Sequence, residues 1–278
     1  MVFDAPAVLP ALLTPFDERG DVDARALADH VEFLIESGVD GIMPCGTTGE
    51  TALLEADETL QVVRTVVEAT AGRVPVVAHV GRPSTTATAR LIEAAIDAGA
   101  AGVSAIVPYY YKLGDREIVA HFRALLKASG DTPLLAYTFP ARTGNELSAE
   151  AFKTLVGDGL AGLKDSTSDD EVHAGYLAAA PEAQIFVGSP SKLLGSLRGG
   201  SRGGVAALAN LRPELVLALA HAWRDSSDHA EELQEEVRAA EQALAQEPPL
   251  VALKRGVSEL MAARGARYPS ALRSPLGA

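Results

Sequence analysis

The feature that most constrains the fold is a pattern that repeats along the whole chain. A short apolar run ends in a polar or glycine-containing turn, and a segment with the apolar spacing of a helix follows. The apolar runs lie at about residues 8–13, 41–45, 74–80, 102–107, 133–139, 161–166, 184–188 and 203–208. Helices are expected at about residues 23–37, 56–71, 84–98, 116–128, 148–156, 169–179, 191–197 and from Pro213 onward. Runs that are apolar throughout indicate strands covered on both faces, which is typical of a parallel sheet.

Eight such units in a chain of 278 residues predict an α/β fold, a closed (β/α)8 TIM barrel. An open doubly wound sheet is the alternative, but no Gly-x-Gly-x-x-Gly sequence follows the first run. We expect the barrel to occupy residues 1–225. Residues 226–278 are expected to form a helical extension packed on the barrel, with helices at about 227–246 and 250–264.

Composition excludes several classes of function. The chain has 24 basic and 37 acidic residues, a formal net charge of −13, which disfavours binding to nucleic acid or to anionic membranes. No uncharged apolar run is long enough to span a membrane, and no signal peptide is evident. The single cysteine, Cys45, permits no internal disulfide, so we expect a cytoplasmic protein. The acidic, lysine-poor composition fits either a high-GC genome or a high-salt cytoplasm.

The sixth apolar run, Ala161-Gly-Leu-Lys-Asp-Ser166, carries a lysine near the end of a strand. An ammonium group buried there would lose its hydration, so the neutral amine is favoured and the pKa falls. A neutral amine can attack a ketone and form a Schiff base, whose protonated imine draws electrons from a neighbouring carbon–carbon bond. Taken alone, Lys164 could equally extend from a surface strand into solvent.

Other polar side chains follow neighbouring strands at the same end of the predicted barrel, where barrel enzymes place their sites. They are Thr47 and Thr48, the tyrosines Tyr109, Tyr110 and Tyr111, Tyr137, Arg142 and Ser189. Singly, each has a structural explanation, such as a helix cap or packing at the rim. Together they supply what imine chemistry requires, because a tyrosine coupled to a threonine hydroxyl can move protons. Backbone N–H groups of Gly46-Thr-Thr-Gly49, predicted to open the second helix, can hold a carboxylate, and Arg142 can bind a second anion.

These motifs resemble the dihydrodipicolinate synthase / N-acetylneuraminate lyase family of pyruvate-dependent class I aldolases. The similar segments are Gly46-Thr-Thr-Gly-Glu50, Pro108-Tyr-Tyr110, Tyr137-x-x-Pro140 and Gly162-Leu-Lys-Asp165, in that order. The likeness extends from Thr14-Pro15 to Arg273-Ser-Pro-Leu276. The resemblance implies a homotetramer that acts on pyruvate and an aldehyde and uses no metal or organic cofactor.

The resemblance also implies roles for individual residues. Lys164 would form the Schiff base with pyruvate, and Tyr137 would be the general acid and base. Thr47 and Thr48 would bind the pyruvate carboxylate, and one of them, expected to be Thr48, would join the proton relay as a catalytic residue. Tyr110 would complete that relay, in some members across a subunit contact. Gly46, Arg142, Ser189 and Val205 complete the expected substrate-binding set.

The substrate branch is less constrained. Arg142, in Pro140-Ala-Arg-Thr-Gly144, resembles the arginine with which dihydrodipicolinate synthases bind aspartate semialdehyde. Thr138, Gly188-Ser-Pro190 and Glu247-Pro248 depart from that branch, whereas Pro108-Tyr-Tyr-Tyr111, Lys164-Asp-Ser166 and Gly188-Ser189 resemble 2-keto-3-deoxy-gluconate aldolases. Ala78-His-Val-Gly81 is similar to the neuraminate lyases. We expect cleavage of 2-keto-3-deoxy-gluconate or its 6-phosphate. The alternatives are condensation of pyruvate with aspartate semialdehyde and a non-catalytic keto-acid-binding barrel.

Overall fold

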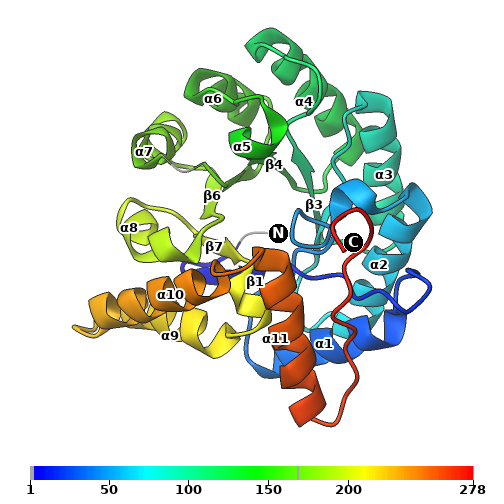
Figure 1. Cartoon of the computed structure of the whole chain (residues 1–278). Coiled ribbons are helices and arrows are strands. Elements are labelled where there is room, and N and C mark those ends of the chain that lie inside the picture. The colour runs from blue at the N-terminus through cyan, green and yellow to red at the C-terminus, as the bar shows by residue number, and fades with distance from the viewer. Residues whose placement is uncertain (1–2, 168, 278) are drawn as a thin grey trace.

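A computed structural model describes residues 3–167 and 169–277 and shows a curled parallel sheet surrounded by helices (Figure 1). The strands are β1 Ala7–Pro10, β2 Val77–His79, β3 Gly102–Ile106, β4 Leu134–Thr138, β5 Gly162–Asp165, β6 Gln184–Val187 and β7 Gly203–Ala206. Their order is β1-β7-β6-β5-β4-β3-β2, and every pair is parallel. This arrangement confirms the predicted barrel class.

The run predicted as a strand at residues 41–45 closes the barrel without forming a strand. Isolated parallel bridges join Met43 to Ala11 and Ile42 to Val76, so this segment lies between β1 and β2. Two features keep it short: Pro44 has no N–H to donate, and Cys45 has a φ of 61°, which ends the extended backbone. The segment thus occupies the position of the eighth strand of the barrel, between β1 and β2.

Helices follow the strands as the periodicity predicts. They are α1 Ala24–Glu36, α2 Ala56–Thr70, α3 Thr85–Asp97, α4 Asp115–Ser129, α6 Ala149–Gly157, α7 Asp170–Ala179, α8 Leu193–Arg198 and α9 Pro213–Arg224. Ser84 caps α3 by accepting from the Ala87 N–H, and Pro213 occupies the first turn of α9, where its missing N–H costs nothing. The sequence does not predict α5 (Pro140–Thr143) or three 3₁₀ turns, η1 Thr51–Leu53, η2 Pro190–Lys192 and η3 Leu208–Asn210.

Two apolar layers result from the alternation of side chains along each strand. Inside the barrel a compact cluster fills the centre, formed by Phe3, Ala7, Leu9, Ala11, Met43, Val77, Leu135, Phe186 and Val205. A much larger cluster lies between the outer face of the sheet and the helices. This cluster excludes water from the centre of the barrel, so a polar side chain that points into the barrel next to it is shielded from solvent on that side.

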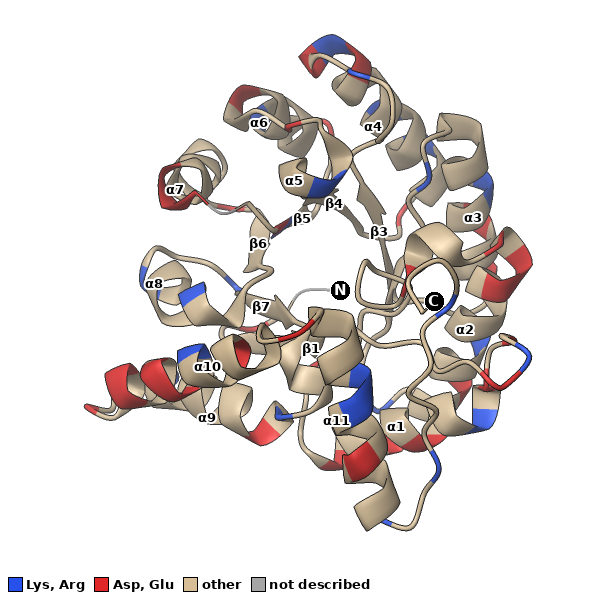
Figure 2. Ribbon diagram, in the orientation of Figure 1, with Lys and Arg blue, Asp and Glu red and all other residues tan. Residues whose placement is uncertain are grey.

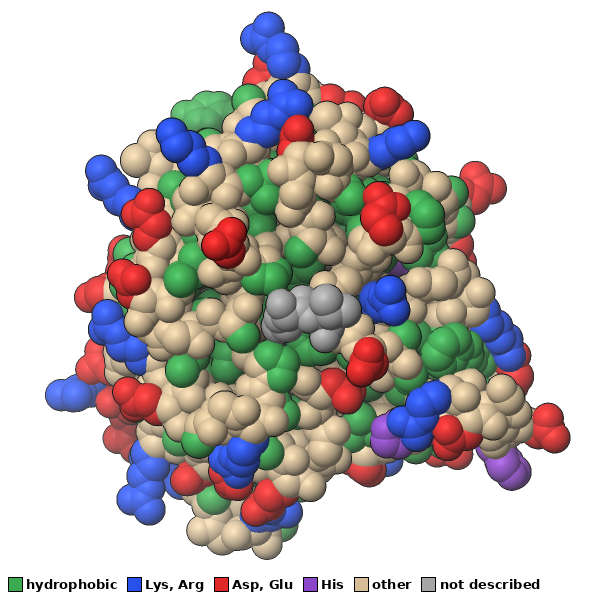
Figure 3. Space-filling view, turned by 180° about the vertical axis from the view of Figure 1, so that it is seen from behind, with side chains coloured by type: hydrophobic (Ala, Val, Ile, Leu, Met, Phe, Trp, Pro, Cys, Tyr) green, Lys and Arg blue, Asp and Glu red, His purple; other side chains and the backbone are tan. Residues whose placement is uncertain are grey.

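The end of the barrel opposite the one facing the viewer in Figure 1 is shown in Figure 3. Apolar side chains gather around the middle of this face, and acidic and basic side chains lie mainly toward its edge. Phe3 is buried there against the inner cluster, and its N–H donates to the Gln184 side chain at 2.8 Å. No helix in the described part of the chain is long and apolar enough to cross a bilayer.

After α9 the chain forms two more helices, α10 Ala230–Leu244 and α11 Pro249–Ala263, and a tail that returns to α2. Arg273 in this tail binds Glu58 through both guanidinium nitrogens at 2.6 Å. Acidic residues are dense along α10, in keeping with the net negative charge (Figure 2). The boundary at residue 225 stays a prediction.

Candidate active site

Lys164 lies inside the barrel on β5, in register with Tyr137 of β4 and Phe186 of β6. Only 4% of the residue is exposed. Burial lowers the pKa of its amine to about 7. A large fraction of the amine is therefore neutral at physiological pH and able to act as a nucleophile.

The Tyr137 ring lies beside this amine, with the Lys164 Nζ 4.3 Å from the ring centroid. The Tyr137 hydroxyl and the Thr47 Oγ1 are 3.1 Å apart and share a hydrogen bond. Burial raises the pKa of the phenol, while the hydroxyls of Thr47 and Ser166 oppose that rise. The phenol is thus held protonated, next to the amine, and the Thr47 hydroxyl bonded to it can relay a proton.

The turn Gly46–Gly49 delivers Thr47 and Thr48 to the mouth, and both side chains are half-buried. Its flanks are strained, because Cys45 and Glu50 have φ angles of 61° and 59°. The prediction that this turn opens the second helix is wrong: it leads into η1, and α2 begins only at Ala56. The Gly46 carbonyl accepts from the N–H groups of Gly49 and Thr51 at 3.0 and 3.2 Å, which closes the turn on itself.

Arg142 lies on α5, just beyond the end of β4, and its side chain is exposed. Its guanidinium carbon is 5.9 Å from the centroid of the Phe139 ring. Its positive charge acts on Tyr137, where it favours the phenolate and lowers the pKa against the effect of burial. Figure 2 shows α5, with a basic segment, next to β4 at the end of the barrel that faces the viewer. The arginine is therefore close enough to the phenol to act on a charged substrate there.

Ser189 lies just after β6, and Val205 lies within β7. Ser189 Oγ is 2.8 Å from Ser191 Oγ and donates to Glu241 on α10 at 3.4 Å. Burial raises the pKa of the Glu241 carboxyl, which also accepts from the Ser191 N–H at 2.8 Å. Val205 is buried in the inner cluster. Sequence reasoning missed Glu241, because nothing in the sequence of α10 distinguishes it from the exposed acids around it.

Tyr110 is not drawn into the site by this chain alone. It is 86% exposed, packs edge to face on Tyr111 with ring centroids 5.1 Å apart, and has a φ of 81°. Such a φ is strained for an aromatic residue, and strain of this kind is often retained for function. Its role in the relay stays a prediction.

A buried histidine beside Tyr137 was given no role from sequence. His79 lies on β2, is fully buried, and its ring packs edge to face on Tyr137 with centroids 5.5 Å apart. Burial, aided by the charge of Lys164, lowers the pKa of His79 well below its usual value. The signal was available: Val77 and His79 are two residues apart, so both face the barrel interior.

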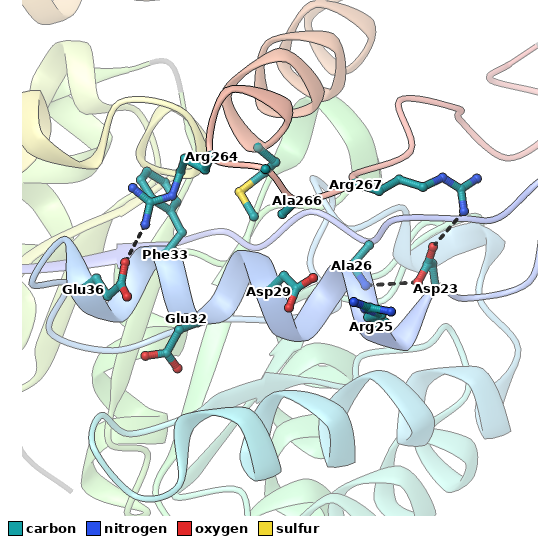
Figure 4. Close-up of a pocket in the computed structure, with 12 residues that line it drawn as sticks. Asp23, Arg25, Ala26, Asp29, Glu32, Phe33, Glu36, Arg264, Ala266 and Arg267 are labelled. Carbon is teal, nitrogen blue, oxygen red and sulfur yellow. Dashed lines mark hydrogen bonds and ion pairs between the residues drawn. The ribbon is translucent and has the colours of Figure 1, made fainter.

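A groove of about 650 Å³ lies outside the barrel between α1 and the end of α11 (Figure 4). Two ion pairs cross it: Arg264 binds Glu36 at 2.5 Å, and Arg267 lies 3.9 Å from Asp23. These pairs hold the C-terminal segment against α1. The groove shares no residue with the amine, phenol and hydroxyl group described above.

Comparison with known proteins gives consistent matches over the whole chain. The family model described as the dihydrodipicolinate synthetase family matches residues 4–278. An uncharacterized DapA-like lyase of Halobacterium salinarum is 40% identical over 97% of this chain and 87% of its own length. A 4-hydroxy-tetrahydrodipicolinate synthase of Methanopyrus kandleri is 32% identical over 92% of this chain and 87% of its own.

A solved structure agrees with these matches. The E. coli K12 prophage protein YagE, which belongs to the dihydrodipicolinic acid synthase family and was solved in complex with pyruvate, superimposes with a TM-score of 0.91. It is 26% identical, and the match covers 97% of this chain and 92% of that one.

Proposed function

The chain belongs to the dihydrodipicolinate synthetase family and is therefore a pyruvate-dependent lyase of the lysine Schiff-base type, and we propose that it cleaves a 2-keto-3-deoxy sugar acid to pyruvate and an aldehyde. In this proposal Lys164 is the Schiff-base lysine and Tyr137 is the general acid and base. The substrate would be 2-keto-3-deoxy-gluconate or its 6-phosphate.

The observation that carries the proposal is the position of Lys164. Its amine is buried, its pKa is lowered to about 7, and its Nζ lies 4.3 Å from the centre of the Tyr137 ring. A buried lysine that is kept charged for structural reasons needs an anionic partner. For Lys164 the cause of the lowered pKa is burial, which favours the neutral amine. The arrangement supports a nucleophilic amine with a proton donor beside it.

The reaction follows from these groups. The neutral amine adds to the C2 carbonyl carbon, and the carbinolamine loses water after its oxygen is protonated. Tyr137, as phenolate after that transfer, takes the proton of the C4 hydroxyl, and the C3–C4 bond breaks. The bonding electrons pass to the iminium nitrogen, the aldehyde leaves, and the resulting enamine is protonated at C3. Hydrolysis of the pyruvate imine restores Lys164.

The turn at Gly46 would hold the carboxylate of the substrate. Thr47 and Thr48 are half-buried at the mouth, and Thr47 already shares a hydrogen bond with Tyr137. Thr47, in place of the expected Thr48, would therefore serve both the carboxylate and the proton relay, and Thr48 the carboxylate. This division of labour places the keto carbon between the carboxylate site and the amine.

Hydroxyl and carboxylate groups at the end of β6 favour the sugar-acid substrate. Ser189, Ser191 and Glu241 form one hydrogen-bonded group, and Ser191 and Glu241 line a cavity of about 690 Å³. Such groups bind the hydroxyls of a polyol.

Condensation of pyruvate with aspartate semialdehyde is the second candidate, and Arg142 is the observation that favours it. A guanidinium is the side chain best suited to bind a carboxylate in two-point fashion. Arg142→Ala is expected to raise KM for the distal partner and leave KM for pyruvate nearly unchanged. An equal rise for both would refute a distal role for this arginine.

Borohydride trapping tests the shared chemistry. Incubation with pyruvate and borohydride should add one reduced pyruvate to Lys164, seen as a mass increase on the peptide that contains it. A protein that binds pyruvate without being modified would instead be a keto-acid sensor. A side-by-side assay with 2-keto-3-deoxy-gluconate, its 6-phosphate and aspartate semialdehyde then decides the substrate branch.

A further inference from the structure

A chain of short hydrogen bonds connects three polar side chains on the outer side of the sheet. His173 of α7 lies between them, with its Nε2 2.6 Å from Ser196 Oγ and its Nδ1 2.6 Å from Asp165 Oδ2. Asp165 and Ser196 are buried, and 12% of the His173 side chain is exposed. Asp165 directly follows Lys164 on β5, so its side chain points to the opposite face of the sheet.

The roles of the two ring nitrogens depend on the tautomer of His173. When Nδ1 carries the proton, it donates to Asp165 and Nε2 accepts from the Ser196 hydroxyl. The same order of an acid, a histidine and a serine occurs in serine hydrolases, which also need oxyanion donors beside the serine. In this protein the remaining side-chain hydrogen bonds of Asp165 instead go to Thr167, in the segment that follows Lys164.

The carboxylate of Asp165 fixes the backbone immediately beyond β5. Its Oδ1 accepts from the Thr167 N–H at 2.8 Å, and its Oδ2 accepts from the Thr167 hydroxyl at 3.2 Å. Ser166 lies between these two residues, and its hydroxyl is near enough to the Tyr137 phenol to lower the pKa of that group. That hydroxyl also fits closely against Gly188, where an added Cβ would lie 2.0 Å from it. Small changes of backbone at Ser166 would therefore move its hydroxyl away from the phenol.

We propose that His173 is a positioning residue for catalysis: by holding Asp165, it orients Ser166 as a second hydroxyl on the Tyr137 phenol. This assignment rests on the proposed Schiff-base function and deepens it. Ser166 then shares with Thr47 the task of receiving and returning the proton that Tyr137 moves. Ser196 and α8 form the outer anchor of the chain.

The geometry separates this role from that of the amine. Lys164 lies within the ladder, paired in register with Tyr137 on one side and Phe186 on the other. Ser166 lies one residue past the end of β5, where its N–H still donates to the Thr138 carbonyl at 3.0 Å. On the other side of Ser166, Thr167 is held by its hydrogen bonds to the Asp165 carboxylate. Loss of His173 should therefore slow proton transfer at Tyr137 while leaving the Lys164 amine in place to form the imine.

The test compares two measurements on the full-length protein. The yield of borohydride trapping after equilibration with pyruvate reports the amount of imine, and exchange of the pyruvate methyl protons in D₂O reports proton removal from the imine. His173→Phe keeps an aromatic ring and removes both hydrogen bonds. We expect its exchange rate to fall by about tenfold to a hundredfold, as for a small misplacement of a reacting group, and its trapping yield to stay within about twofold.

Three further variants make the result specific. Ser166→Ala should lower exchange to a similar extent, and His173→Gln, which can donate to Asp165 and accept from Ser196, should recover most of the rate. His229→Phe is the matched control, because His229 is exposed just before α10, and both measurements should equal those of the wild type. All assays are run well below the melting temperature of the least stable variant.

Two results would overturn the assignment. One is a His173→Phe protein whose exchange is as fast as in the wild type. The other is an equal fall of exchange and trapping, with no recovery in His173→Gln, which would make the hydrogen-bond chain a general support for the strand. Failure of the wild type to be trapped by pyruvate is a distinct result, since it removes the proposed function and this assignment with it.

Discussion

Two lysines are buried in this protein, and their surroundings are opposite. Lys254 of α11 pairs with Glu50 at 2.5 Å, and neither side chain is exposed. Lys164 of β5 faces a tyrosine ring, and burial lowers its pKa to about 7. Burial lowers the pKa of Lys254 too, but the carboxylate of Glu50 opposes this effect. A buried amine with an anionic partner is a structural tie, whereas a buried amine beside a phenol is free to react.

The structural lysine supports the reactive one from a distance. Glu50 ends the turn that carries Thr47 and Thr48, and it has the strained φ of 59°. Besides Lys254, it accepts from the Arg273 N–H at 2.9 Å. Lys254 also donates to the Ala271 carbonyl at 2.8 Å. The ion pair therefore ties the site turn to α11 and to the C-terminal tail.

Replacing the reactive lysine should have the largest effect on catalysis and should not lower the stability of the fold. Lys164→Met is expected to abolish turnover and borohydride trapping, because no amine remains to form the imine. Its melting temperature at pH 7 should rise, since the wild type loses on the order of 4 kcal/mol by holding this amine at a lowered pKa. Mass spectrometry and thermal unfolding measure both. Residual trapping at another lysine would contradict the assignment.

Removing the phenol should separate the amine from its proton donor. Tyr137→Phe keeps the ring beside Lys164 and is expected to lower kcat by a factor of about 10²–10⁴, the range for lost general acid–base catalysis. Trapping at Lys164 should persist, though more slowly. Steady-state kinetics give the first result and time-resolved trapping the second. Normal turnover would show that another group moves the proton.

Replacing the structural lysine should reverse this pattern. Lys254→Met leaves the Glu50 carboxylate buried without its cation, which costs about 3–5 kcal/mol of unfolding free energy. Urea unfolding measures the loss, and any folded protein should still be trapped by pyruvate at Lys164. The double variant Glu50→Gln, Lys254→Met removes the uncompensated charge and should regain part of the stability. Equal stability of the single and double variants would argue against a charged pair.

The dependence of stability on pH should distinguish the two lysines most finely. The pKa of Lys164 is about 7 in the folded protein and near its ordinary value of 10.5 when the chain is unfolded. Between these values the unfolded chain binds more protons, so the destabilisation by Lys164 is complete below pH 7 and is relieved as pH rises toward 10.5. The stability advantage of Lys164→Met should shrink by about 1.4 kcal/mol per pH unit between pH 8 and 10. A constant advantage would show that the amine is not buried in its neutral form.

Much of the barrel could be predicted from the chain alone, because each of its units buries a local apolar pattern. The runs at residues 102–107 and 184–188 predicted β3 and β6 to within one residue at either end. The apolar run at 41–45 predicted a strand that does not form, since Pro44 and the left-handed backbone of Cys45 leave only isolated bridges. Short helices such as α5 were not predicted either, because four residues carry no periodicity.

What the sequence determined by itself is the alternation that makes a barrel and the presence of Lys164, Tyr137 and Thr47 at the ends of its strands. The tertiary structure decided which of these groups touch: it joined Thr47 to Tyr137, added Ser166 and His79, and gave Lys254 the carboxylate that Lys164 lacks. The physical reason is that periodicity is a local property, whereas desolvation and pairing of a charge depend on residues far away in the chain. The same amine becomes a tie or a nucleophile according to what the fold places beside it.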